Sequence, residues 1–153
     1  MTTKILPASN RGKYNNEWLN TRYIYSFAHF FDPNRVGFRN LLVINHDIIS
    51  AKGGFGEHGH RDMEIITIPL TGMISHKDNI GGIGHIKAGA IQYMSAGLGI
   101  VHEEMNITNK PCELLQIWIE PKVLGSKPYY LDQQTSWLEN VVLFYKLSGE
   151  KII

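Results

Sequence analysis

The chain has 153 residues, which suits one ordinary domain and leaves little room for a second of similar size. Hydrophobic residues make up 43% of it, enough to bury a core and to exclude a disordered chain. Fifteen Lys and Arg oppose 14 Asp and Glu, so no broad field favours nucleic acid or an anionic membrane surface.

The cysteine content and the N-terminal residues bear on the compartment. The single cysteine, Cys112, excludes an internal disulfide framework, fits a reducing compartment and is expected to be a buried small apolar residue. Residues 1–10 lack the apolar run of a signal peptide, and no later stretch approaches a membrane span. We therefore expect a cytoplasmic protein that contacts neither membrane nor nucleic acid directly.

Short alternating segments separated by glycine-rich turns predict an all-β fold. The first segment is 23–31, where a ring occupies every second position from Tyr23 to Phe31 and, in a strand, would lie on one buried face. Further strands are expected at residues 40–46, 64–70, 73–76, 83–86, 91–94, 99–104 and 113–119. Turn signals such as Gly53-Gly54 and Gly81-Gly82 separate them. This spacing predicts a jelly-roll barrel or a sandwich.

Two pairs of side chains with the same spacing carry the chemistry. His58 and His60 stand at i and i+2, so on a strand both imidazoles project from one face. His102 and Glu104 repeat this spacing. If the two strands are neighbours in one barrel, three imidazoles and a carboxylate converge on a single ion with open positions. The two pairs therefore predict a metal site.

The spacing leaves the carboxylate open. Glu64 follows His60 by four residues, so by parity alone it is an alternative to Glu104. His76 and His85 lie between the two pairs but belong to no H-x-H or H-x-E pair, and they are interpreted as surface or hydrogen-bonding residues.

An ordered series of motifs resembles the pirin family of cupins. It comprises H-G-H-R-D-M-E-I-I from His58, S-H-K-D from Ser75, and I-Q-Y-M-S-A-G-L-G-I-V-H-E-E from Ile91. Upstream W-L-N-T-R from Trp18 and downstream L-Q-I-W-I-E-P from Leu115 resemble the same family, so the likeness covers nearly all of residues 10–131.

The resemblance implies a single cupin-type jelly-roll barrel and a ligand set. Its metal would be held by His58, His60, His102 and Glu104, with Glu64 only a neighbour. The implied ion is Fe(II), although the ligand types also suit Mn, Ni, Cu or Zn. Pirin-like chains typically carry two cupin domains. We therefore expect residues 1–125 to be the N-terminal cupin domain, and 126–153 a tail that is the stub of a missing second one.

Three functions are compatible with the resemblance. The first is an enzyme, a quercetin (flavonol) 2,3-dioxygenase using O2, in which Glu104 acts as ligand and catalytic base. The second is an iron-dependent binding or regulatory module resembling a transcription cofactor. The third is an inactive truncated metal-binding fragment. Because residues 141–145 form an apolar run without second-domain cover, we also expect a homodimer.

Overall fold

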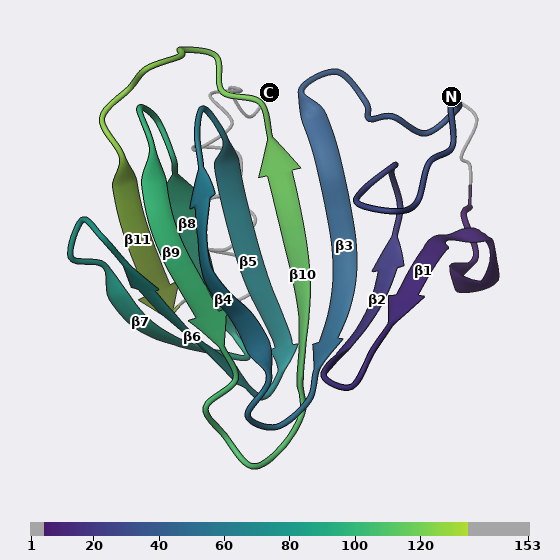
Figure 1. The fold of residues 1–153 in the computed structure, drawn as a ribbon, viewed down its shortest axis with the longest axis horizontal. Helices are drawn as coiled ribbons and strands as arrows, with labels where there is room; N and C mark the ends of the chain where they lie inside the picture. The colour runs from purple at the N-terminus through teal and green to yellow at the C-terminus, as the bar shows by residue number, and fades with distance from the viewer. Residues whose placement is uncertain (1–4, 135–153) are drawn as a thin grey trace.

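The computed structural model describes residues 5–134, whose strands form two antiparallel sheets that face each other (Figure 1). In spatial order the larger sheet comprises β1 (Gly12–Asn15), β2 (Leu19–Tyr23), β3 (Leu41–Ile49), β10 (Cys112–Ile119), β5 (Glu64–Thr71), β8 (Ala90–Ser95) and β11 (Tyr129–Gln134). The smaller sheet comprises β4 (Gly54–His60), β9 (Ile100–Met105), β6 (Met73–Asp78) and β7 (Ile83–Lys87). A short 3-10 helix, Ala8–Asn10, precedes β1. The predicted all-β, jelly-roll architecture is confirmed.

The space between the sheets is layered, because alternate residues of each strand point inward. Along β8 the inward residues run from Ala90 through Gln92 to Met94, that is, apolar, polar, apolar. On β6 and β9 the inward residues run from an apolar residue, Ile74 or Ile100, to polar ones. The middle layer, called the polar belt below, consists of Thr67, His76, Gln92, His102, Glu104 and Gln116.

Apolar clusters lie on both sides of the polar belt and exclude water from it. One cluster contains Leu19, Ile49, Ile74, Ile86, Ala90, Cys112 and Leu114, with Trp18 and Phe55 packed against it. The other contains Ile65, Met94, Ala96 and Ile100, with Met63, Trp118 and Tyr130 packed against it. Burying this apolar surface stabilises the fold, and it places the polar belt in a setting of low dielectric constant.

Most predicted strands are confirmed, with ends that differ by at most three residues. Strands β3, β5, β6, β7, β8, β9 and β10 correspond to the seven predicted segments from residue 40 onward. Strands β1, β2, β4 and β11 were not among the predicted segments, although the His58–His60 pair was interpreted on the assumption that it lies on a strand. Cys112 is fully buried and free, as expected.

The predicted strand at 23–31 is wrong. Strand β2 ends at Tyr23, and the chain then reverses in a tight turn in which the backbones of Phe27 and Phe30 hydrogen-bond to each other. Ala28 in this turn has a φ of 50°, which a strand does not allow. The rings of Phe27 and Phe30 both pack on Tyr23, whereas Phe31 is 74% exposed. The rings therefore meet through a turn and do not share a strand face.

The structure describes only part of the predicted tail. Strand β11, from the predicted tail, pairs with β8 at the edge of the larger sheet. The apolar run 141–145, on which the expected homodimer rests, lies outside the described residues.

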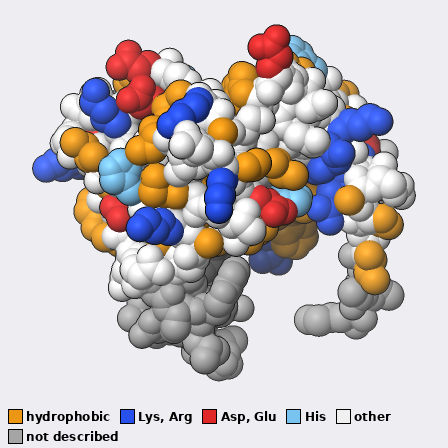
Figure 2. Space-filling view, turned by 90° about the horizontal axis from the view of Figure 1, so that it is seen from below, with side chains coloured by type: hydrophobic (Ala, Val, Ile, Leu, Met, Phe, Trp, Pro, Cys, Tyr) orange, Lys and Arg blue, Asp and Glu red, His pale blue; other side chains and the backbone are white. Residues whose placement is uncertain are grey.

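Within residues 5–134 no helix has the length and apolar character needed to cross a membrane. Figure 2 shows basic and acidic side chains interspersed over one face of the described part.

Candidate metal centre

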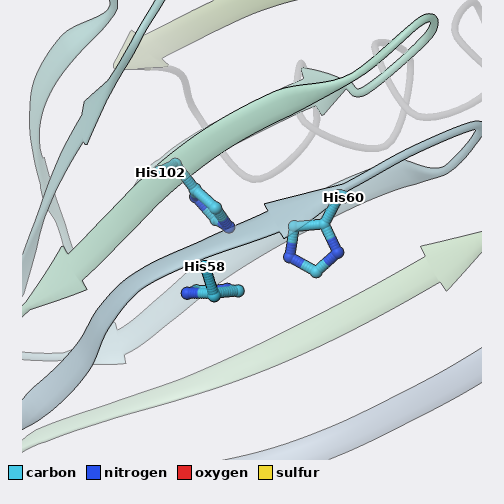
Figure 3. Close-up of side chains that lie close together, drawn as sticks. All are labelled: His58, His60 and His102. Carbon is cyan, nitrogen blue, oxygen red and sulfur yellow. The ribbon is translucent and has the colours of Figure 1, made fainter.

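Three imidazoles from β4 and β9 converge between the sheets (Figure 3). The antiparallel register places His58 directly opposite His102, and His60 projects from the same face of β4 as His58. The ring centroids are 4.4 Å apart for His58 and His102, 5.0 Å for His60 and His102, and 4.9 Å for His58 and His60. One nitrogen of each ring lies within 4.8 Å of one nitrogen of the other two. This is the separation at which several rings can share one ion.

Burial lowers the pKa of two of these imidazoles, His60 and His102. Burial, and then the neighbouring imidazoles of His102 and His58, lower the pKa of His60 to about 4. Burial, and then His58 and His76, lower the pKa of His102 to about 3. Both rings are therefore unprotonated near neutral pH, which is the form that binds a metal.

Hydrogen bonds determine which ring nitrogen of each histidine has a lone pair available for a metal ion. Nδ1 of His58 lies 2.7 Å from the carbonyl oxygen of Gly56, and since a carbonyl only accepts, Nδ1 carries the hydrogen and Nε2 keeps its lone pair. Nε2 of His102 is buried and has no hydrogen-bond partner among the described residues. Buried nitrogens are rarely left without a partner, so a lone pair in this position fits a metal ion.

Glu104 enters the centre from the buried side of β9. Its side chain is 2% exposed. Oε1 accepts hydrogen bonds from Thr67 Oγ1 and Gln92 Nε2, both at 3.1 Å, and Oε2 accepts one from Gln116 Nε2 at 2.7 Å. A carboxylate oxygen has two lone pairs, so Oε2 retains one for a metal or for a proton. The residues present thus fit a divalent transition metal ion.

The four predicted ligands do not form a single cluster in the structure but are divided between two clusters. His58, His60 and His102 form one cluster of potential ligand atoms within 4.8 Å of one another. Glu104 belongs to a second cluster of the same tightness, with His102 and His76. The two clusters share His102, which therefore stands at the centre of the arrangement.

Glu64 lies away from this centre, which removes the alternative left open by spacing. Strand β4 ends at His60 and β5 begins at Glu64, and between them Asp62 has a φ of 47°, so the inward parity is not continuous. Glu64 accepts hydrogen bonds from Tyr93 and Ser95, which alternate with the inward residues of β8. The parity argument for Glu64 was therefore wrong.

His76 is a hydrogen-bonding residue, one of the two predicted options, but its buried place beside the centre was not foreseen. The sequence interpretation grouped it with His85 as a surface or hydrogen-bonding residue. His85 is indeed exposed, but His76 is 1% exposed and hydrogen-bonds to Asp78 and His102. A search for H-x-D pairs would have found it, because His76 and Asp78 repeat the i, i+2 spacing on β6.

Neighbouring side chains hold Glu104 and His60 in place. Trp118 Nε1 donates to Gln116 Oε1 at 3.2 Å, which turns the amide nitrogen of Gln116 toward Glu104. The Trp118 ring also packs edge-on against His60, at a centroid distance of 4.8 Å and an interplanar angle of 85°. Trp118 is partly buried and packs against the apolar cluster that contains Ile65, so it links that cluster to the centre.

The fold and the clustered imidazoles define a cupin-type β-barrel with a candidate mononuclear metal centre. The family model described as Pirin matches residues 6–119, and the chain belongs to the pirin family. The predicted family resemblance is thereby confirmed.

Named relatives and solved structures agree with this assignment. The chain is 46% identical over 124 residues to quercetin 2,3-dioxygenase of Escherichia coli strain K12, covering 80% of this chain and 54% of that protein. It is 44% identical to YhhW from Escherichia coli, whose crystal structure superposes with a TM-score of 0.83 over 85% of this chain and 56% of YhhW. A structure of the bacterial pirin YhhW in complex with nickel(II) gives 0.81 at 44% identity, over 84% of this chain and 56% of that chain. The chain spans about half the length of the curated relatives it matches.

Proposed function

We propose that the chain holds one divalent transition metal ion on His58, His60, His102 and Glu104. The convergence of three imidazoles, one of them with an unpartnered buried nitrogen, supports this ligand set. The nickel(II) complex of YhhW supports a metal at this kind of barrel. We propose Fe(II) as the physiological ion, since three imidazoles and one carboxylate with open positions suit Fe(II) and O2, although Mn, Ni, Cu and Zn accept the same donors.

We further propose that the loaded protein acts on a flavonol such as quercetin as a 2,3-dioxygenase, with O2 as co-substrate and carbon monoxide as a product. The observation that carries this proposal is the imidazole cluster, present in a chain 46% identical to quercetin 2,3-dioxygenase. The low-dielectric polar belt favours such chemistry, because charges that develop there are poorly screened by water.

The side chains around the centre have separate tasks in this proposal. A bound metal supplies a Lewis acid that lowers the pKa of a coordinated hydroxyl. The unused lone pair of Glu104 Oε2 would hold either the ion or the proton of that hydroxyl, so that in acting as base Glu104 would exchange its bond to the ion for an O–H bond, while Gln116 keeps the carboxylate in place. Trp118 and the apolar cluster around Ile100 exclude water from the side of His60.

We propose that residues 1–125 correspond to the N-terminal cupin domain of longer pirin-like proteins and residues 126–153 to the start of the segment that follows it. The family match, which ends at residue 119, supports this division. On this division strand β11 belongs to the second segment, and it forms the edge strand of the larger sheet by pairing with β8. The expected homodimer stays a prediction.

The test is turnover by the purified chain in air. Protein loaded in turn with Fe(II), Mn(II), Ni(II) or Cu(II) is mixed with quercetin, and loss of flavonol absorbance and release of carbon monoxide are followed. We expect turnover by at least one loaded form. His60→Ala is the inactive control, and His85→Ala, an exposed histidine on β7, is the matched variant that should keep full activity.

One outcome would overturn the proposal that the chain is an enzyme. If every form binds metal stoichiometrically but none exceeds His60→Ala, the dioxygenase proposal fails. Metal-dependent binding of a macromolecular partner would then favour the regulatory module.

A further inference from the structure

A chain of buried contacts leads from the centre into β6. Asp78 Oδ2 lies 2.9 Å from His76 Nε2, and His76 Nδ1 lies 3.3 Å from His102 Nδ1. The side chains of His76 and Asp78 are both 0% exposed. The register of β6 and β9 creates this chain, because Asp78 stands directly opposite His102.

The chemistry of the groups sets the direction of every hydrogen in this chain. A carboxylate only accepts, so His76 Nε2 carries a hydrogen. With that hydrogen on Nε2, the His76 ring offers a lone pair on Nδ1, which accepts a hydrogen from His102 Nδ1. His102 is left with its lone pair on Nε2.

The opposite arrangement is unfavourable. A hydrogen on His102 Nε2 would be a buried donor, and that atom has no acceptor among residues 5–134. Leaving a buried donor unsatisfied costs about 1–3 kcal/mol. With the directed chain the unpartnered atom is instead a lone pair, which a metal ion can fill, whereas a donor at Nε2 would stay without an acceptor.

Both members of the chain are themselves fixed. Asp78 Oδ1 accepts hydrogen bonds from the backbone nitrogens of Ile80 at 2.9 Å and Gly82 at 2.7 Å. The ring of His76 stacks on Tyr130 of β11, with centroids 4.2 Å apart and planes at 15°. Neither side chain can turn without losing these contacts.

We propose that Asp78 and His76 are positioning residues that set the tautomer of His102, so that its Nε2 lone pair faces the metal. The proposal rests on the metal centre proposed above. It assigns His76 to orienting a ligand and not to binding the metal, although His76, His102 and Glu104 have the spacing of a ligand group.

The first measurement is spectroscopic and uses metal-free protein. In full-length chain labelled with 15N-histidine, we expect His102 to show a protonated Nδ1 and an unprotonated Nε2. Asp78→Asn should invert this tautomer. The backbone nitrogens of Ile80 and Gly82 hold the amide oxygen of the new side chain, so its NH2 group donates to His76 and reverses the chain. A wild-type His102 protonated on Nε2 would overturn the proposal.

The second measurement is Ni(II) affinity by titration calorimetry. Asp78→Asn should raise the Ni(II) dissociation constant about 10- to 100-fold, the usual effect of losing an orienting partner of a ligand. The matched control is Asp32→Asn, which alters another loop-capping carboxylate, paired with Arg35, and should leave the affinity unchanged. Equal Ni(II) affinity of Asp78→Asn and wild type would overturn the proposal.

The third measurement separates positioning from ligation. In His76→Gln the amide can accept from His102 and donate to Asp78, so the Ni(II) affinity should stay within about threefold of wild type. In His76→Ala both contacts are lost, so the Ni(II) dissociation constant should rise about 10- to 100-fold. Equal losses in both variants would make His76 a ligand and overturn the proposal. If wild type shows the expected tautomer but binds no metal, the proposed function fails and the directed chain stands. The tautomer of wild type needs no substitution, so a poorly folded variant does not remove the test.

Discussion

The two ligand pairs have the same spacing but occupy different environments. His58 and His60 on β4 are half-buried, and the hydrogen bond recorded for them among the described residues joins His58 to Gly56. His102 and Glu104 on β9 are 1% and 2% exposed. Side chains of β5, β6, β8 and β10 hydrogen-bond to this second pair.

The difference separates two roles. The β9 pair belongs to the polar belt, so it contributes both to metal binding and to the folded state. The β4 pair stands at the rim, where substitution removes a ligand and little else. The following experiments break or sharpen this contrast, in order of decreasing expected effect.

Glu104→Ala should have the largest effect on stability. It leaves three buried donors, from Thr67, Gln92 and Gln116, without their acceptor, so we expect the free energy of unfolding to fall by about 3 kcal/mol. Urea denaturation measures this loss, and elemental analysis should show that metal is lost too. Glu64→Ala is the comparison, because Glu64 lies away from the centre and its substitution should leave the metal in place. Greater metal loss from Glu64→Ala would contradict the assignment.

His102→Ala and His58→Ala should both lose most of the bound metal but differ in stability. Removing buried His102 deprives His76 of one of its two hydrogen-bond partners and leaves a cavity, so we expect a loss of about 2 kcal/mol in metal-free protein. His58 is half-buried, and its loss should cost about 0.5 kcal/mol or less. Metal content and thermal unfolding of both variants, beside His85→Ala, test the contrast. Equal destabilisation by the two substitutions would remove it.

The stability of metal-free protein should depend on His60 as the pH falls. The folded pKa of His60 is lowered to about 4, below the unfolded value near 6.5, so the unfolded chain takes up the proton first. The stability that neutral His60 contributes is present above pH 6.5 and is lost as the pH falls toward 4. We therefore expect the stability of wild type relative to His60→Ala to fall by about 1–2 kcal/mol between pH 7 and pH 4. A constant difference in urea denaturation would contradict the lowered pKa.

Asp47→Asn should produce the smallest effect, and one of opposite sign. Burial, and then the charge of Glu104, raise the pKa of Asp47 on β3 to about 6. Ionised Asp47 thus costs stability, a cost that develops between pH 4 and pH 6 and is complete above it. We expect the variant to be about 1 kcal/mol more stable at pH 7.5 and equal to wild type below pH 4. Urea denaturation at both pH values measures this, and a less stable variant at pH 7.5 would show that the Asp47 charge is favourable.

Local alternation predicted the strands well where the chain stays extended. It failed at residues 23–31, because ring alternation does not reveal that Ala28 turns the backbone into the left-handed region. It also did not detect β11, since four of its six residues are polar or exposed and the strand is held by pairing with β8. A pattern of period two reports which face a side chain takes only if a strand continues through it.

The sequence by itself determined the all-β class, the pirin family and the two i, i+2 pairs, because these depend on residues close together in the chain. Only the tertiary structure decided that His102 joins two clusters, that Glu64 faces away, and that His76 and Asp78 support the centre. The physical reason is that strand register, set by hydrogen bonds between residues far apart in sequence, determines which side chains meet. Two such long-range contacts are the hydrogen bond from Asp62 in the turn before β5 to Gly97 and the pairing of β6 with β9. They place two ligand pairs of the same spacing in different environments.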